Sequence, residues 1–186
     1  MTITSVPGLL PGVWTIDPVH SEIGFTVRHL MSKVRGVFRE FEGAVEVAED
    51  VAASRATATV KMASIDTGNQ QRDDHLRSSD FFEIDKYPEM TFVSTGLRPN
   101  GDDPSSFILV GDLSLKGVTK QIELAAEFLG VDQDAFGATR AGFEATGKIN
   151  RKDFGVNGNV PLSGEKFLIG DEVTINITVE AVFKKE

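Results

Sequence analysis

Apolar and polar side chains alternate along several long stretches of this chain, and this period of two constrains the fold more than any other feature. The four clearest runs cover residues 22–28, 107–115, 121–128 and 172–183. Weaker runs lie near residues 36–47, 54–62, 90–97 and 138–150. Successive side chains of a strand point to opposite faces, so each run predicts a strand with one buried face. The pattern therefore predicts about eight or nine strands.

Short turn segments separate the runs, among them Lys116–Val118 and Pro99–Asp102. Connections of hairpin length join antiparallel strands, whereas parallel strands need long crossovers. Several runs exceed eight residues, and long meandering strands favour an up-and-down barrel, which leaves no open edge. We therefore predict an all-β antiparallel barrel of about eight or nine strands. A chain of 186 residues suits a single domain over residues 1–186.

Three segments interrupt the alternation. Residues 1–12 contain two prolines and two glycines, so we expect a flexible or loosely packed N-terminal segment. Residues 69–80 are polar and start like a helix cap, which predicts a short helix at about Gln70–Ser79. Residues 151–170 have little periodicity but are too apolar for a solvated linker. A segment of that kind predicts a lid-like loop over the mouth of the barrel.

The charge balance excludes some partners. The chain carries 28 acidic and 19 basic residues, a formal net charge of −9. We expect no nucleic-acid binding, because such binding depends on neutralising phosphates. The balance also opposes docking on an anionic membrane, unless a local basic patch exists. With no stretch of about 20 apolar residues and no secretion-signal pattern in residues 1–12, we expect a cytoplasmic protein without stable membrane insertion.

Motifs for catalysis or metal binding are missing from the sequence. It has no cysteine, and its three histidines (His20, His29 and His75) include no His-x-His or His-Glu-x-x-His pair. Neither a Gly-x-Ser-x-Gly elbow nor a phosphate-binding or dinucleotide-binding glycine motif occurs in a suitable context. We therefore expect no enzyme, no catalytic residue, no metal and no cofactor.

His29 is one of two polar features that could face a ligand. In an unbroken strand it shares parity with Phe25 and Val27 and points inward, while His20 points outward. A buried imidazole needs a hydrogen-bond partner. His29 is therefore either a satisfied structural histidine or a donor to the polar end of a ligand.

The second polar feature is the predicted helix Gln70–Ser79. Arg72, His75 and Ser79 would share one of its faces, where Arg and His together could hold a phosphate or a quinone oxygen. The alternative is a solvated surface helix whose Arg72 and Arg77 pair with Asp73, Asp74 and Asp80.

Phenylalanine is unusually dominant among the aromatic residues, with 13 against one Tyr and one Trp. Rings without polar groups suit a dry apolar interior. An eight-stranded barrel either fills with its own side chains or holds one small ligand, so both uses stay open at this point.

An ordered set of motifs along nearly the whole chain resembles the YceI-like family. The motifs are Trp14-Thr-Ile-Asp17 with His20-Ser21, Phe25-x-Val27-x-His29, Gly36-x-Phe38-x-x-Phe41-x-Gly43, Ser64-Ile-Asp-Thr67, Arg72-Asp-Asp-His75-Leu76-x-Ser78, Asp80-Phe-Phe82, Tyr87-Pro88-x-Met-Thr-Phe92, Gly111-x-Leu-Ser-Leu-x-Gly117-Val-Thr119-Lys120 and Asn150-Arg151-x-Asp153-Phe154-Gly155. The single pieces are short, but their order and spacing are specific.

The resemblance implies a lipocalin-like, extended eight-stranded barrel with an internal tunnel, one short helix and a long lid-like loop. It implies non-catalytic binding, carriage or sequestration of a long-chain isoprenoid, such as a prenyl quinone or polyprenyl pyrophosphate, or of a related amphiphilic lipid. It also implies a possible homodimer. Many family members carry a secretion signal, and this chain resembles the branch that lacks one.

Carried onto this chain, the resemblance places the apolar wall at inward residues that include Phe25, Val27, Phe38, Phe92 and Phe107. We assign the polar end to His29, Arg72 and His75 from their chemistry, because the family pattern does not specify it. Structural roles are expected for Trp14 as a plug, Asp17 at a turn, and Arg151 with Asp153 as a latch on the long loop. Two other functions stay open: a stress-related interaction protein with a filled barrel, and an enzyme using His29 or His75 on a lipid or quinone.

Overall fold

The computed structural model describes residues 6–164 and 166–185. Its strands are β1 (Gly12–Ile16), β2 (Glu22–His29), β3 (Ser32–Phe38), β4 (Phe41–Val47), β5 (Arg55–Lys61), β6 (Ile65–Asp66), β7 (Glu89–Pro99), β8 (Ser106–Leu115), β9 (Val118–Gln133), β10 (Thr139–Asn150) and β11 (Ile169–Phe183). One α-helix, α1 (Gln70–Arg77), and the short 3-10 helices η1 (Val51–Ala53), η2 (Met62–Ser64) and η3 (Arg151–Phe154) complete the described elements.

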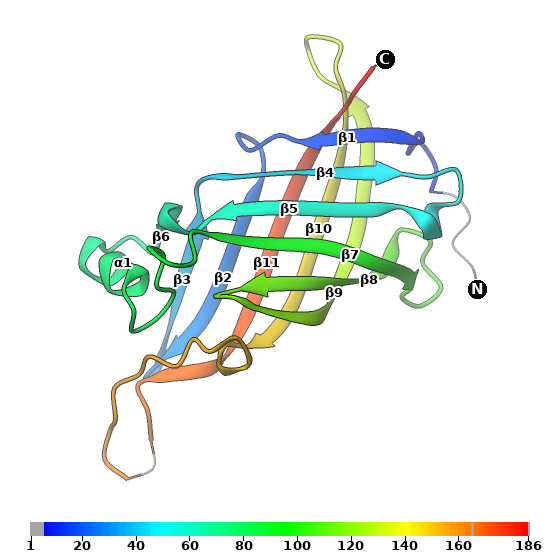
Figure 1. The fold of residues 1–186 in the computed structure, drawn as a ribbon. Helices are drawn as coiled ribbons and strands as arrows, with labels where there is room; N and C mark the ends of the chain where they lie inside the picture. The colour runs from blue at the N-terminus through cyan, green and yellow to red at the C-terminus, as the bar shows by residue number, and fades with distance from the viewer. Residues whose placement is uncertain (1–5, 165, 186) are drawn as a thin grey trace.

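Eight strands close into an antiparallel ring in the order β1-β4-β5-β7-β8-β9-β10-β11, and β11 pairs back onto β1 (Figure 1). From β7 to β11 each strand pairs with the next one along the chain, as an up-and-down barrel requires. The all-β, lipocalin-like barrel expected from the period-two pattern is confirmed, and every weaker run of alternation forms a strand.

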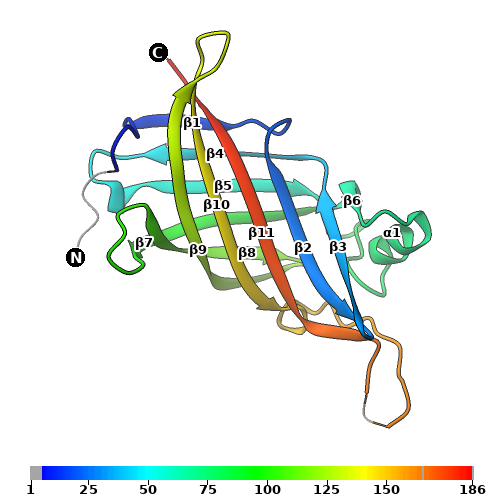
Figure 2. The same cartoon turned by 180° about the vertical axis from the view of Figure 1, so that it is seen from behind.

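The barrel is extended at one end by β2 and β3. Strand β1 pairs with residues 181–183 of β11, and β2 continues along the same edge and pairs with residues 169–178. Strand β3 pairs with β2, and after two residues β4 pairs with β1. The β2–β3 hairpin therefore projects beyond the ring together with the start of β11 (Figure 2). A bend at residues 39–40 divides the run at residues 36–47 between β3 and β4. Strands β1 and β6 lie outside every run of alternation, so the pattern does not predict them.

Turn chemistry fixes the register of the longest hairpin. Lys116 and Gly117 both have positive φ, 50° and 75°, as a two-residue type I′ turn requires. From that turn, β8 and β9 pair without interruption as far as Ser106 opposite Glu127. Every residue of β8 is thereby assigned to the inner or the outer face of the barrel.

Two clusters of buried residues pack the barrel. One includes Phe38, Met62, Phe81 and Phe154, around the segments that follow β5 and α1. The other surrounds Trp14, which is fully buried, donates its Nε1–H to the carbonyl of Leu10 at 2.9 Å and packs against Phe183. Burial of Trp14 matches the plug expected for it.

The N-terminal segment contacts the barrel at two residues. Residues 1–5 lie outside the described part of the chain, but Val6 is buried in the Trp14 cluster and Leu9 packs against it. The side chains of Pro7, Leu10 and Pro11 are exposed. Loose packing of this segment therefore stays a prediction, apart from these two contacts.

The single α-helix begins where expected and ends two residues early. The Asn69 side chain accepts a hydrogen bond from the Arg72 backbone N–H at 2.9 Å and caps the N-terminus. Ser78 ends the helix in an extended conformation, so Ser79 does not share a face with Arg72 and His75. No helix in the described residues is long and apolar enough to cross a membrane.

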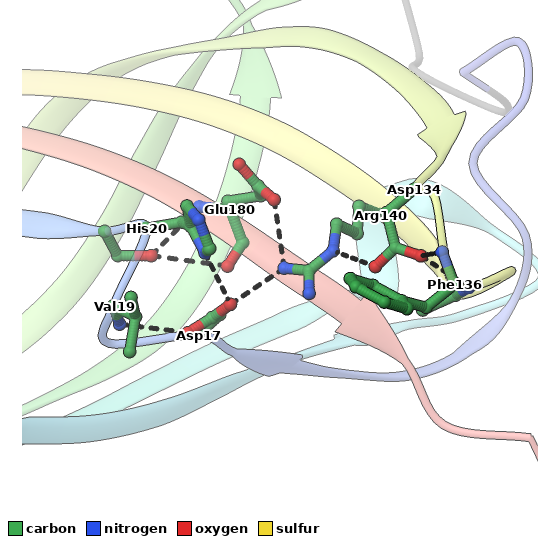
Figure 3. Close-up of polar contacts among 9 residues, drawn as sticks. Asp17, Val19, His20, Asp134, Phe136, Arg140 and Glu180 are labelled. Carbon is green, nitrogen blue, oxygen red and sulfur yellow. Dashed lines mark hydrogen bonds and ion pairs between the residues drawn. The ribbon is translucent and has the colours of Figure 1, made fainter.

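A network centred on Arg140 of β10 ties the ends of four strands together (Figure 3). Its guanidinium donates to Asp134 in the β9–β10 hairpin at 2.8 Å, to Asp17 after β1 at 2.8 Å and to Glu180 of β11 at 2.9 Å. The second carboxylate oxygen of Asp17 accepts the backbone N–H of Val19, which confirms the expected turn role. These bonds from Arg140 hold the pKa of Asp17 and of Asp134 below the usual range.

The lowered carboxyl pKa values predict how stability depends on pH. A carboxyl whose pKa is lower in the folded state stabilises the fold fully above its unfolded pKa, about 3.9, and loses that contribution as the pH falls through the folded value. We expect the unfolding free energy to fall from about pH 5 towards pH 2, and Arg140→Gln to weaken this dependence. Urea unfolding at a series of pH values measures it.

The exposed pair of Arg98 with Glu123 offers a matched control. Because solvent screens this pair, Arg98→Gln is expected to change the pH dependence less than Arg140→Gln does. An Arg140→Gln protein with the wild-type slope would show that the network contributes nothing.

Candidate ligand-binding cavity

A cavity of about 870 Å³ occupies the interior of the barrel. All five residues predicted for the apolar wall lie on its surface: Phe25, Val27, Phe38, Phe92 and Phe107. The volume lies within the range of about 300–1,000 Å³ typical of small-molecule sites. The barrel is therefore not filled by its own side chains.

Alternation along the strands supplies this wall. On β11, the inward positions Val173, Ile175, Ile177 and Val179 line the cavity, while the intervening Thr and Asn residues do not. Strands β8 and β9 contribute in the same way through Phe107, Leu109, Leu113, Leu115, Ile122, Leu124, Ala126 and Phe128. A period-two pattern in a closed barrel thus becomes an apolar lumen with a polar exterior.

Two of the wall rings lie against glycines of a neighbouring strand. Gly36 is the register partner of Phe25, and a Cβ at Gly36 would overlap the Phe25 ring. A Cβ at Gly111 would overlap the Phe92 ring in the same way. Each ring occupies space that a side chain would fill, so it lies along the wall and leaves the lumen open. Sequence reasoning missed this role of Gly36 and Gly111, although a glycine inside a strand is a signal of close approach.

Three elements meet at one end of the barrel. Residues 155–164 and 166–168, which we call the strap, lie between η3 and β11 in the sequence. The Leu30 N–H of the β2–β3 turn donates to the Leu168 carbonyl of the strap at 2.8 Å. Gly158 of the strap packs so closely against the Asp80 backbone and the Phe81 ring, just after α1, that a Cβ would not fit. We call this the strap end.

Much of the polar lining of the cavity comes from the strap end. His29, Arg72 and His75, the three residues predicted for the polar end, all line the cavity, as does Asn159 of the strap. They come from β2, α1 and the strap, which are far apart in the sequence. The residues meet at the cavity surface, while their contact with a ligand stays a prediction.

The three predicted residues differ in how far they are already bonded. Arg72 donates from Nε to Thr67 Oγ1 and from Nη2 to the Thr67 carbonyl, both at 2.7 Å. His75 is exposed, and its Nε2 lies 2.8 Å from Asp80 Oδ2. The His29 ring is half-buried and has no hydrogen bond to any residue of the described ranges. His29 thus has the most free hydrogen-bonding capacity.

Several other polar residues of this motif hold α1 in place. The buried Asp73 accepts hydrogen bonds from the backbone and hydroxyl of Thr67, the residue that Arg72 also contacts. Arg77 pairs with Asp74 at 2.9 Å and donates to backbone carbonyls before the helix. The surface-helix alternative is therefore correct for Arg77, whereas Arg72 bonds Thr67 and Asp80 bonds His75.

Arg151 anchors the strap through backbone carbonyls. It is buried and donates to the carbonyls of Gly170 at 2.8 Å, Val156 at 2.7 Å and Gly158 at 2.8 Å. Burial lowers the pKa of Arg151. Among the described residues, the one carboxylate within 4 Å of its guanidinium is that of Asp171, at 3.9 Å, so the latch forms without an ion pair to Asp153. The latch exists, but carbonyl oxygens replace the carboxylate because the strap folds back over the guanidinium.

The three histidines lie in different places. His20 is exposed and its Nδ1 lies 2.9 Å from Asp17, on the outside of the barrel. Among the described residues, no group of three His, Asp or Glu side chains is arranged to hold a metal ion.

The chain resembles known proteins over most of its length. A family model described as the YceI-like domain matches residues 14–181. A UPF0312 protein of Photorhabdus laumondii is 40% identical over 168 residues, which cover 89% of this chain and 83% of the relative. The YceI protein of Escherichia coli is 39% identical with the same coverage.

Solved structures share the architecture. The YceI protein of Campylobacter jejuni superposes with a TM-score of 0.71 at 35% identity, covering 85% of this chain and 90% of that one. BcnA of Burkholderia cenocepacia gives 0.75 at 24% identity, covering 89% and 99%. A polyisoprenoid binding domain from Saccharophagus degradans gives 0.69 at 15% identity, covering 92% and 98%. The last two likenesses concern the fold alone.

The contact between Gly36 and Phe25 predicts a coupled pair of substitutions. Gly36→Ala overpacks the site and is expected to lower the unfolding free energy by about 1–3 kcal/mol. In a Phe25→Leu background the same change is expected to cost less, because the ring is no longer there. Urea unfolding of the two single variants and the double variant measures this coupling.

Gly96→Ala is the matched control, since a Cβ at Gly96 meets no atom within 4 Å. Strictly additive effects of Gly36→Ala and Phe25→Leu would show that the ring does not lie against Gly36.

Removing the Arg151 side chain is expected to loosen the strap. Arg151→Met leaves several buried carbonyls without a donor and is expected to cost about 3 kcal/mol of unfolding free energy. It is also expected to speed chymotrypsin cleavage at Phe167, whereas Lys120→Met, at an exposed residue of β9, changes neither. Equal cleavage rates for the two variants would contradict the anchoring role.

Proposed function

The chain belongs to the YceI-like family, and from this membership and the cavity we propose that its barrel binds a long-chain isoprenoid or a related amphiphilic lipid. A prenyl quinone and a polyprenyl pyrophosphate are the ligands to test first. The proposed role is binding, carriage or sequestration without chemical change and without a cofactor. The observation that carries the proposal is the apolar cavity of about 870 Å³ inside a closed barrel.

The size of the cavity favours an occupant over a packing defect. Packed cores contain few voids larger than a water molecule, whereas this cavity measures about 870 Å³. That volume lies within the range of about 300–1,000 Å³ found for sites that bind small molecules. Gly36 and Gly111 leave room for the Phe25 and Phe92 rings to lie along the wall, which keeps the lumen open for a ligand.

The lining matches an amphiphile with a long apolar body. Strands β8, β9 and β11 contribute apolar side chains along the lumen, and His29, Arg72, His75 and Asn159 contribute polar groups from the strap end. Ser54, Arg55 and Glu144 add polar groups at or in β5 and β10. Burial of an alkyl or prenyl chain contributes about 25 cal/mol per Å², and a few polar groups fix its direction. We propose that the head group lies near His29, whose ring is free to donate a hydrogen bond.

The bonding state of the polar residues supports binding more than catalysis. Arg72 and Asp73 are engaged with Thr67, and His75 with Asp80, all of which stabilise the position of α1. A general acid–base needs a partner that orients it towards the reacting proton. His29 has none among the residues described, so catalysis would depend on His75 with Asp80. The fold likeness to a domain named for polyisoprenoid binding makes this ligand class the natural first choice.

The proposal predicts that a charge in the wall abolishes lipid retention. Phe25→Asp places a carboxylate against the apolar lumen, where burial of a charge without a partner is costly. We expect native mass spectrometry with organic extraction to find one lipid per wild-type protein and none in this variant. Incubation with a prenyl quinone or a polyprenyl pyrophosphate tests the two head groups, and the same spectra report whether a homodimer forms.

Phe136→Asp, a change in an exposed hairpin tip outside the cavity, is the control and is expected to retain the lipid. Unchanged lipid content in a folded Phe25→Asp protein would remove Phe25 from the wall. A wild-type protein that stays empty after incubation with both lipids would refute the proposed function.

A further inference from the structure

The β2–β3 hairpin is basic although the chain as a whole is acidic. Residues 23–39 contain four Lys or Arg residues and no Asp or Glu, within a chain of net charge −9. In the ladder of the hairpin, Arg28 lies opposite Lys33, and Thr26 lies opposite Arg35. This register places Arg28, Lys33 and Arg35 on the outer face. All three are exposed, and none forms an ion pair with any residue in 6–164 or 166–185. This face therefore keeps its positive charge.

Apolar side chains project beyond that basic face. Met31 is 94% exposed and Leu30 is 49% exposed at the turn of the hairpin, and Phe167 of the strap is 55% exposed. The hydrogen bond from Leu30 to Leu168 places the turn beside the strap. We call Leu30, Met31 and Phe167 the apolar tip.

The apolar tip is continuous with the mouth of the cavity. His29 and Leu168, the chain neighbours of Leu30 and Phe167, both line the cavity. In Figure 2 the β2–β3 hairpin and the strap extend together beyond one end of the barrel. A surface that met this tip would therefore lie at the strap end, where the polar lining of the cavity gathers.

The β9–β10 hairpin also has an exposed aromatic side chain at its tip, but its surroundings do not favour an anionic surface. Phe136 in the β9–β10 hairpin is 95% exposed, yet its neighbours are Asp132 and Asp134, and Arg140 is engaged with three carboxylates. An anionic surface would be repelled there. The strap end combines apolar tip, positive charge and cavity mouth, and the acidic remainder of the barrel would orient that end towards a negative surface.

We propose that the strap end docks on anionic phospholipid bilayers, with the apolar tip inserted between head groups and the basic hairpin against their phosphates. Each Lys or Arg near such a surface favours binding, and inserted apolar side chains add to it. The barrel's net negative charge opposes docking elsewhere, so the local patch is what permits it. The inference rests on the proposed function in one respect: docking gives the lipid a path between bilayer and cavity.

Co-sedimentation with vesicles tests the proposal. We expect the protein to bind vesicles of phosphatidylcholine mixed with phosphatidylglycerol, to bind phosphatidylcholine alone poorly, and to bind less at high salt. Lys33→Gln is expected to weaken binding about fivefold and Met31→Ser on the order of tenfold. Phe136→Ser, matched to Met31 in exposure, is expected to leave binding unchanged.

Two binding results would overturn docking: vesicle binding without a preference for phosphatidylglycerol, or equal effects of Met31→Ser and Phe136→Ser on vesicle binding. It would also be overturned by a wild-type protein that binds no vesicles and forms a dimer that Met31→Ser dissociates. Circular dichroism checks that each variant is folded.

Native mass spectrometry of the same samples separates this inference from the proposed function. A Met31→Ser protein that retains lipid but loses vesicles supports docking. A wild-type protein that carries lipid but does not bind vesicles overturns docking alone. A wild-type protein that binds vesicles but never carries lipid supports docking and overturns the proposed function.

Discussion

Closure of the antiparallel ladder is the constraint on which the rest of this structure depends. Strand β11 pairs with β10 on one edge and with β1 and β2 in succession on the other, so the ring has no open edge. Once the ring is closed, each strand position faces either the lumen or solvent. The apolar cavity, its polar exterior and the projecting β2–β3 hairpin all follow from this pairing.

Keeping the lumen open is a separate requirement that closure does not meet by itself. A chain with 13 phenylalanines has ample side-chain volume to fill an eight-stranded barrel. In this protein the Phe25 and Phe92 rings lie against Gly36 and Gly111 and along the wall. The width of the lumen is therefore determined by glycines next to large rings. In a solid core, side-chain volumes determine the packing in the same way.

The polar motifs serve mainly to hold one end of the barrel in shape. Thr67 binds Arg72 and Asp73 of the helix, and Arg151 binds the carbonyls of the strap. These contacts fix the rim through which a ligand would enter the cavity. Residues that look catalytic in a linear motif are here largely occupied by structure, and His29, a single residue in a strand, retains free hydrogen-bonding capacity.

The sequence by itself determined most of the strands and their inward faces, because a period of two is a local property that each strand carries unaided, but it did not predict β1 or β6. The five wall residues followed from the family resemblance together with this parity. The sequence also located α1 within two residues, from its cap. Only the tertiary structure decided the partners of Arg151, the contacts of Gly36 and Gly111, and the meeting of hairpin, helix and strap. These depend on register and on contacts between segments more than a hundred residues apart, such as Leu30 with Leu168. Local periodicity does not encode such pairings, so the shape of the cavity mouth could not be read from the chain.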